Sequence, residues 1–229
     1  MKISVYGDSI STFSGLSNNS VTGQDTSYYN KDNFNDCYNT WWMRVIGNKP
    51  NGALLCNEAI SETEVGYYYY NKDRQKPIIS DEHHKGLAWC MNNPKRINTL
   101  GGVVGQSNHP DAILFFGGTN DAILSNDHYE GELFFENYAN ALRLMGSRFG
   151  STTQIVCVTP YRSPLTDECE HLDDVCDKII YACQQGYANC IAVDLRNTNM
   201  YESVAVDATC HPTNIGMERI ANAILEVWK

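Results

Sequence analysis

Short apolar runs recur along the chain, and a cluster of polar, turn-forming residues closes most of them. The first run covers residues 2–6 and stops at Gly7-Asp8-Ser9. Four later runs share its short length and its content of β-branched or aromatic residues: 53–57, 111–116, 154–159 and 190–195. Runs of this kind predict strands that are buried in a sheet.

Longer segments with apolar residues at helical spacing separate these strands. They predict helices over 40–46, 67–70, 92–97, 133–145 and 167–185, and a last helix that Thr213 or Asn214 caps. Alternation of strands and helices predicts a three-layer α/β/α sandwich with a flavodoxin-like, five-stranded parallel sheet. No linker or repeat divides the chain, so we expect one domain over residues 1–229.

Polar clusters follow several of the predicted strands and are therefore expected to meet. The carboxyl ends of parallel strands share one edge of a sheet, where ligands bind. The turn with Ser9, the segments 57–62 and 117–121 and the loop with His211 all follow strands. A serine, a histidine with a nearby carboxylate and a side-chain amide are the groups that acyl transfer requires. We therefore predict a cleft with this chemistry.

The charge of the chain narrows the choice of partners. Its 27 acidic and 17 basic residues give a net charge of -10, which argues against nucleic acid and anionic membranes as partners. No run approaches the ~18 apolar residues of a membrane span, and no signal peptide precedes the first strand. We expect a cytoplasmic protein that binds a small molecule; the sequence does not indicate its oligomeric state.

Nine cysteines are present, and none forms a Cys-x-x-Cys pair. Cys169, Cys176, Cys183 and Cys190 recur every seven residues and coincide with an apolar stripe. We interpret them as small buried hydrophobic residues rather than as metal ligands or disulfide partners. No metal and no organic cofactor is expected.

Two of the polar clusters match motifs of a known family. Gly7-Asp8-Ser9-Ile10-Ser11 resembles the first block of the SGNH (GDSL-type) hydrolases, and Gly117-Gly118-Thr119-Asn120-Asp121 resembles their third. The segment from Asp207 to His211-Pro212 resembles the last block. The resemblance implies that Ser9 is the nucleophile and His211 the general base. It also implies that the Asn120 amide and the backbone N–H of Ser9 bind the oxyanion.

The chain departs from the family pattern at two positions. Glu62 stands where the second block has a glycine whose backbone N–H completes the oxyanion hole, and a positive φ there would cost about 1 kcal/mol or more. The usual Asp-x-x-His spacing places the acid at position 208, which is Ala208. Either Asp207 orients His211 from one residue further back, or a backbone carbonyl does so and the site is a dyad.

Other serine motifs fit the chain less well. Ser107, in Gly105-Gln106-Ser107-Asn108, resembles the nucleophile turn of sialate O-acetylesterases, but it comes directly before a predicted strand. We interpret it as a loop residue. No Gly-x-Ser-x-Gly elbow is present, which argues against the α/β-hydrolase fold.

The resemblance and the polar loop after Ser9 together suggest a substrate. That loop is rich in Tyr and Asn and has few of the apolar lid residues typical of lipases. We therefore expect hydrolysis of a short-chain ester, O-acetyl on a carbohydrate or another small polar alcohol. The residues expected to contact substrate are Asp8, Asn57 and Thr119, with Tyr28, Tyr29 and Phe34 as walls of the cleft. Two alternatives are a lysophospholipase or thioesterase and a binding protein with a decayed site.

Overall fold

A five-stranded parallel sheet forms the centre of the molecule. The computed structural model describes residues 1–17, 27–32, 34–65, 90–123, 129–167, 169–198, 200 and 210–229. The strands are β1 (Lys2–Gly7), β2 (Ala53–Asn57), β3 (Ala112–Phe116), β4 (Gln154–Val158) and β5 (Cys190–Val193). They are all parallel and lie in the order β2-β1-β3-β4-β5, which is the flavodoxin-like order. The predicted fold class is confirmed.

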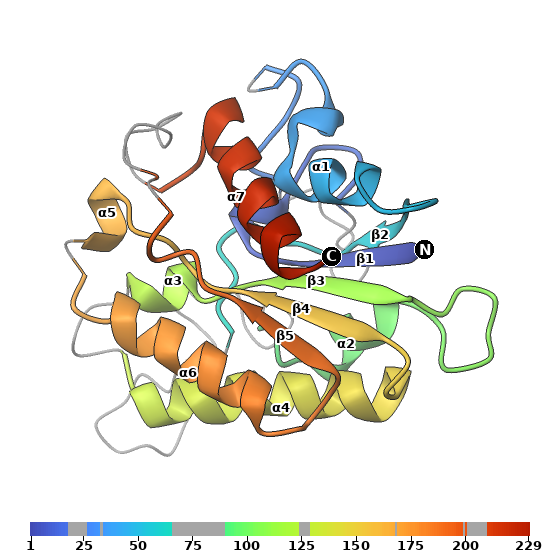
Figure 1. Cartoon of the computed structure of the whole chain (residues 1–229). Helices are drawn as coiled ribbons and strands as arrows, with labels where there is room; N and C mark the ends of the chain where they lie inside the picture. Colours follow the sequence, from blue (N-terminus) through green and yellow to red (C-terminus); the bar gives the residue numbers. More distant parts are fainter. Residues whose placement is uncertain are drawn as a thin grey trace.

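Helices cover both faces of the sheet, and this gives three layers (Figure 1). One face carries α1 (Trp41–Gly47) and α7 (Asn214–Val227), which pack against each other. The opposite face carries α2 (Pro94–Thr99), α4 (Gly131–Phe149) and α6 (Leu172–Gln184). The remaining short helices are α3 (Thr119–Ala122), α5 (Pro164–Asp167) and the two 3-10 turns η1 (Ser9–Ser11) and η2 (Cys37–Asn39).

The apolar core lies in two parts, one on each face of the sheet. Every residue of β3 is buried, as expected of a central strand between two helical layers. Leu114 and Phe116 pack with the cluster that contains Trp41 and Trp42. Ile113 and Phe115 face the other way, into the cluster under α4 and α6. The apolar runs of the sequence therefore became the buried sheet.

The helix predicted over 167–185 begins later than expected, at Leu172, and a separate short helix, α5 (Pro164–Asp167), precedes it. Ser163 and Thr166 cap each other reciprocally: the Ser163 N–H donates to Thr166 Oγ1 at 2.8 Å, and the Thr166 N–H donates to Ser163 Oγ at 3.1 Å. This exchange starts α5 at Pro164, a favoured first helical residue. A separate helix, α6, then begins at Leu172. The predicted helix at 67–70 lies outside the described residues.

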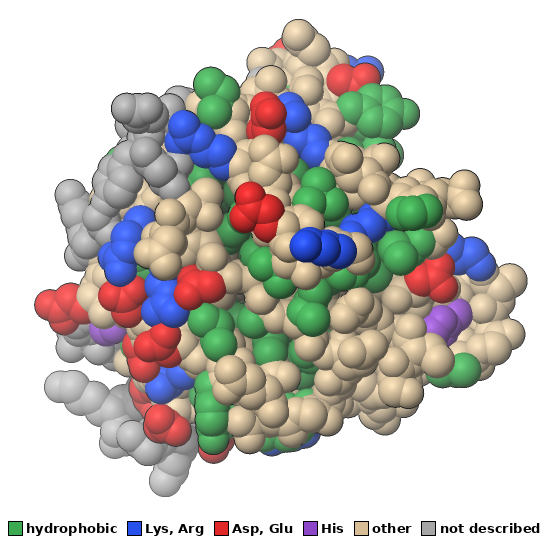
Figure 2. Space-filling view, viewed as in Figure 1, with side chains coloured by type: hydrophobic (Ala, Val, Ile, Leu, Met, Phe, Trp, Pro, Cys, Tyr) green, Lys and Arg blue, Asp and Glu red, His purple; other side chains and the backbone are tan. Residues whose placement is uncertain are grey.

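Charged side chains gather over α6 and beside it (Figure 2). The Arg196 guanidinium bonds to Asp177 and Asp194, each at 2.7 Å, and Arg162 bonds to Asp173 at 2.7 Å. Both of these arginines are thus paired with acidic groups. Among the described residues, no helix is both long enough and apolar enough to cross a membrane.

Candidate active site

The turn after β1 presents Ser9. The Asp8 carboxylate accepts a hydrogen bond from the Ile10 N–H at 3.0 Å and so caps η1, which begins at Ser9. Gly7 is required by close approach, because a Cβ there would lie 2.4 Å from the Phe116 carbonyl oxygen and 2.6 Å from Ser11 Oγ. Strand β1 and this capped turn together fix the position of the Ser9 hydroxyl.

His211 lies on the loop between β5 and α7 and reaches Ser9. Its Nε2 is 2.9 Å from Ser9 Oγ, although the two residues are 202 positions apart in the sequence. This is hydrogen-bonding distance for a nucleophile and its base. Asp207 and Ala208 lie outside the described residues, so the group that orients the imidazole stays a prediction.

Aromatic side chains hold the loop that carries His211. Tyr29 donates a hydrogen bond to the Pro212 carbonyl at 3.1 Å, and Tyr161 donates one to the Cys210 carbonyl. The Tyr28 ring stacks on the imidazole, with ring centroids 3.6 Å apart and planes 7° from parallel. These contacts restrict both the backbone beside His211 and the plane of its ring.

Asn120 lies in α3, directly after β3. Its Nδ2 donates to the Thr63 carbonyl at 2.7 Å, which orients the amide and leaves its second N–H for another acceptor. The neighbouring Asp121 accepts from the Val65 N–H at 3.2 and 3.1 Å through its two oxygens. These bonds join α3 to the segment that contains Glu62.

Glu62 adopts the left-handed backbone conformation that glycine favours. Its φ is +62°, and its side chain is exposed. The turn around it is pinned to β1, since the Ile60 N–H donates to the Gly7 carbonyl at 3.0 Å. Thr63 Oγ1 also donates to the Ile60 carbonyl at 2.9 Å. These hydrogen bonds offset the conformational strain of a positive φ at a residue other than glycine.

The side chains expected to contact substrate are largely buried. Asn57 is 1% exposed; its Nδ2 donates to the Ser11 carbonyl at 2.9 Å, and its Oδ1 accepts from the Ala59 N–H at 2.9 Å. Asp8 is fully buried, and Thr119 is 4% exposed. Asn57 thus holds the Ser9 turn and the 58–62 turn together. A direct role of these three residues in substrate binding stays a prediction.

Two carboxyl groups near the site are strongly desolvated. Burial raises the pKa of Asp8 to about 7, although the Ile10 N–H stabilises its ionised form. Burial, with the charge of Asp121 beside it, raises the pKa of Glu64 to about 8. Desolvation outweighs the groups that stabilise the ionised forms, so both carboxyls titrate near neutral pH.

Some neighbours of the site differ from the sequence analysis. Tyr29 and Phe34 are core residues, with 0% and 4% exposure. Of the three aromatic walls expected, Tyr28 stacks on the His211 ring and Tyr29 lies edge-on to it, with ring centroids 6.2 Å apart. Arg96, expected on a basic helix, is fully buried. It donates to the Glu58 carbonyl at 2.9 Å and lies 4.7 Å from the Tyr6 ring centroid. Nothing in the sequence around Arg96 indicates that this side chain is buried.

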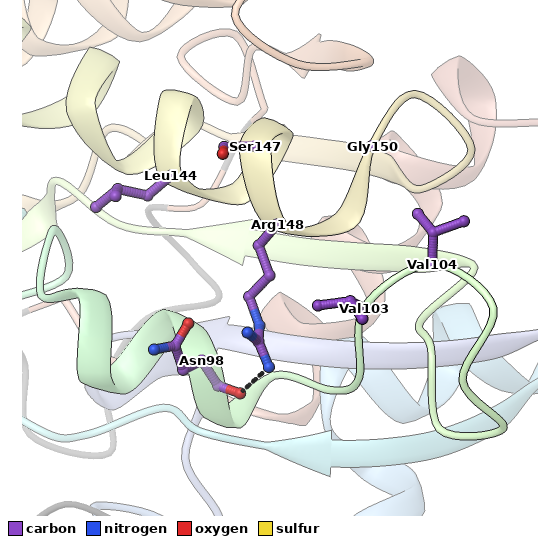
Figure 3. Close-up of a pocket in the computed structure, with 7 residues that line it drawn as sticks. All are labelled: Asn98, Val103, Val104, Leu144, Ser147, Arg148 and Gly150. Atoms are coloured by element: carbon purple, nitrogen blue, oxygen red, sulfur yellow. Dashed lines mark hydrogen bonds between the residues drawn. The ribbon is translucent and has the colours of Figure 1, made fainter.

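A hollow of about 470 Å³ lies away from this pair (Figure 3). Residues of α2, of the loop before β3 and of the end of α4 line it, at the edge of the sheet where the strands begin. Its arginine, Arg148, donates to the Asn98 carbonyl at 3.1 Å and the Gly101 carbonyl at 2.9 Å. Ser107 lies on the same loop, before β3, as expected. The Ser9–His211 pair belongs to the opposite edge.

Solved structures with this fold include several esterases. A member of the lipolytic protein G-D-S-L family from Veillonella parvula matches with a TM-score of 0.58 at 16% identity, over 100% of this chain and 98% of that one. A family two carbohydrate esterase from Clostridium thermocellum matches at 0.58 and 15%, over 99% and 62%. An acetylxylan esterase from Geobacillus stearothermophilus matches at 0.56 and 15%, over 98% and 92%.

The sequence itself also identifies the family. No match is found among curated proteins. The family model described as GDSL-like Lipase/Acylhydrolase matches residues 1–228, which is nearly the whole chain. The chain therefore belongs to the GDSL-like lipase/acylhydrolase family of serine ester hydrolases.

Proposed function

We propose that this protein is a serine esterase that removes a short acyl group, O-acetyl above all, from a carbohydrate or another small polar alcohol. The observation that carries the proposal is the 2.9 Å contact between Ser9 Oγ and His211 Nε2. A hydroxyl and an imidazole at this distance can exchange a proton during nucleophilic attack.

In the first half of the reaction, Ser9 Oγ attacks the ester carbonyl carbon while His211 Nε2 takes its proton. The tetrahedral intermediate then collapses, the bond to the alcohol oxygen breaks, and His211 returns the proton to that oxygen. The alcohol leaves, and the acyl group stays on Ser9. In the second half, water attacks the acyl carbon while His211 takes its proton; the bond between this carbon and Ser9 Oγ then breaks, His211 returns the proton to Ser9, and the carboxylic acid product is released.

Three N–H groups would bind the oxyanion of each tetrahedral intermediate. They belong to the backbone of Ser9, the backbone of Glu62 and the side chain of Asn120. The Asn120 amide is held by the Thr63 carbonyl at 2.7 Å, and Glu62 has the backbone conformation of the glycine usual at its position. Asp207 or a backbone carbonyl would orient the imidazole.

The choice of substrate rests on fold relatives and on the residues around the base. The relatives named as a carbohydrate esterase and an acetylxylan esterase share the fold over at least 98% of this chain. The half-buried Tyr28 ring stacks on the His211 imidazole and so places an aromatic group, of the kind that sugar rings contact, beside the base. A short acyl chain and a polar alcohol fit these surroundings.

Replacing the nucleophile tests the proposal. Ser9→Ala should lose p-nitrophenyl acetate hydrolysis, by about 1,000-fold or more in kcat. A fluorophosphonate should label the wild type on Ser9 at a stoichiometry near one per chain, and leave Ser9→Ala unlabelled. Ser107→Ala is the matched control and should keep wild-type turnover. A wild-type protein that stays unlabelled would instead be the decayed binding protein.

Chain-length profiling tests the substrate class. With p-nitrophenyl esters, kcat/KM should fall as the acyl chain lengthens beyond acetyl, and acetylated sugars should be turned over. A profile that rises toward long acyl chains would favour the lysophospholipase or thioesterase alternative.

A further inference from the structure

Three thiols lie close together on the face of the sheet that α4 and α6 cover, away from the Ser9–His211 pair. They belong to Cys157 in β4, Cys183 in α6 and Cys190 at the start of β5. Their sulfur atoms all lie within 4.8 Å of one another. Cys157 is buried, and the other two are half-buried. We refer to these three residues as the thiol cluster.

The sheet register explains why these residues meet. Cys190 pairs with Ile155, and Cys157 pairs with Ala192, so the two cysteines are diagonal neighbours on one face of the sheet. That face lies against α6, and Cys183 is in the last turn of this helix. One residue from each of three elements thus contributes a sulfur atom, and the cluster depends on the tertiary fold.

The donor set indicates what could bind there. Three sulfurs within 4.8 Å can reach a common centre, and the cluster includes no His, Asp or Glu among the described residues. Thiolates select soft metal ions, above all copper(I) and zinc. Structural zinc sites nearly always take four protein ligands, whereas this cluster supplies three. We propose that Cys157, Cys183 and Cys190 bind one copper(I) ion through their three sulfur atoms.

A buried hydroxyl beside the cluster supports this proposal. Tyr138 in α4 is fully buried, and its hydroxyl has no hydrogen-bond partner among the described residues. The three cysteines lie close enough to act on this hydroxyl electrostatically, but no hydrogen bond of ordinary geometry joins it to them. Buried donors seldom lack an acceptor. A metal-bound thiolate sulfur would accept from this hydroxyl, as outer groups around metal sites commonly donate to the ligands.

The thiol cluster is separate from the esterase residues. Cys190 opens β5, whereas His211 follows the other end of that strand. Metal binding would release thiol protons to solvent and needs neither Ser9 nor His211. Ester hydrolysis and copper binding can therefore be measured independently on the same protein.

Competition for copper(I) tests the proposal. Reduced, full-length protein is titrated with copper(I) under anaerobic conditions against bathocuproine disulfonate. The wild type should bind one ion per chain and show near-ultraviolet sulfur-to-copper charge transfer. Cys183→Ser and Cys190→Ser should each weaken binding by about 100-fold or more, since changes to outer groups alone reach that size. Tyr138→Phe should weaken it by about 10-fold and keep the stoichiometry.

Matched controls separate site loss from unfolding. Cys37→Ser removes another half-buried thiol, on η2, and should bind copper(I) like the wild type. Each variant should keep wild-type p-nitrophenyl acetate hydrolysis, which reports an intact fold. Cys183→Ala gives a second version of the same deletion in case the serine variant loses this activity.

Three results would overturn the proposal. The first is the absence of stoichiometric copper(I) binding by the wild type. The second is binding that survives both Cys183→Ser and Cys190→Ser. The third is tight zinc binding, or a disulfide within the thiol cluster, in a protein that does not bind copper(I) when reduced.

Discussion

The nucleophile and the base are held in place by different means. Ser9 is positioned by its own short stretch of chain: a buried strand, a glycine that permits close approach and an aspartate cap on the Ile10 N–H. His211 is positioned by side chains from distant segments, because Tyr29 and Tyr161 bind the carbonyls on either side of it. A local motif thus encodes the nucleophile, whereas the tertiary fold supplies the position of the base.

Removing the base should have the largest effect. His211→Ala is expected to lower kcat for p-nitrophenyl acetate by about 1,000-fold or more, because Ser9 then lacks a proton acceptor. The unfolding free energy should change little, since the imidazole is half-buried on a loop. His109→Ala, at the opposite edge of the sheet, is the control and should keep its activity. Substantial turnover by His211→Ala would remove histidine from the mechanism.

The nucleophile turn contains a carboxyl group whose ionisation should weaken the fold. The pKa of Asp8 is about 7 in the folded protein, against 3.8 for an ordinary aspartate. The folded state therefore binds more protons between these values, and the unfolding free energy should fall as pH rises from about 4 to about 7. The expected loss from Asp8 alone is on the order of 4 kcal/mol, since each pKa unit is worth about 1.4 kcal/mol.

Asp8→Asn should reduce this pH dependence, because the amide oxygen keeps the cap on Ile10 without a charge. The Glu64 carboxyl, whose pKa burial also raises, should keep its own part of the slope. Urea unfolding at several pH values measures the slope. Asp36→Asn, at the exposed cap of η2, is the matched control and should keep the wild-type slope. A flat wild-type profile would show that Asp8 is solvated or paired in solution.

Steric crowding at the nucleophile turn should cost less. Gly7→Ala places a methyl group 2.4 Å from the Phe116 carbonyl oxygen, so β1 and β3 must separate. We expect a loss of about 2 kcal/mol in unfolding free energy, together with lower kcat as Ser9 shifts. At Gly47, a Cβ would meet nothing within 4 Å, so Gly47→Ala should not destabilise the protein. Equal stability of both variants would contradict the close contact.

The smallest effects are expected from the tyrosines that hold the base loop. Tyr161→Phe and Tyr29→Phe each remove a donor to a carbonyl beside His211, and each should cost about 1 kcal/mol. If these bonds position the imidazole, kcat should fall several-fold with little change in KM, and the pH profile of kcat/KM should shift. Tyr138→Phe removes a buried hydroxyl that has no described partner and should leave kcat unchanged. Loss of stability alone would assign the two tyrosines a purely structural role.

The sequence predicted the sheet and its polar edge because both depend on local patterns. Buried strands are short and apolar, and their carboxyl ends meet at one edge whatever the side chains. Ser9 and His211 could therefore be expected as neighbours from topology alone, although the sequence does not specify their 2.9 Å separation.

Features that depend on long-range packing could not be predicted. The sequence places Asn57 at the polar edge of the sheet, but it does not reveal that the Asn57 amide bonds to the Ser11 carbonyl and the Ala59 N–H. The seven-residue spacing of cysteines drew attention to Cys183 and Cys190, but Cys157 completes the thiol cluster from another strand. The register of the strands determines which side chains become neighbours, and a single sequence does not reveal this register.

The 202 residues between Ser9 and His211 have a consequence for biosynthesis. During translation the serine emerges early, and the histidine follows only after all five strands have been made. A ribosome-bound chain that stops before residue 211 contains the nucleophile Ser9 but lacks its proton acceptor, His211. Hydrolytic activity therefore appears late in synthesis, and a chromogenic ester would report when the last segment has joined the domain.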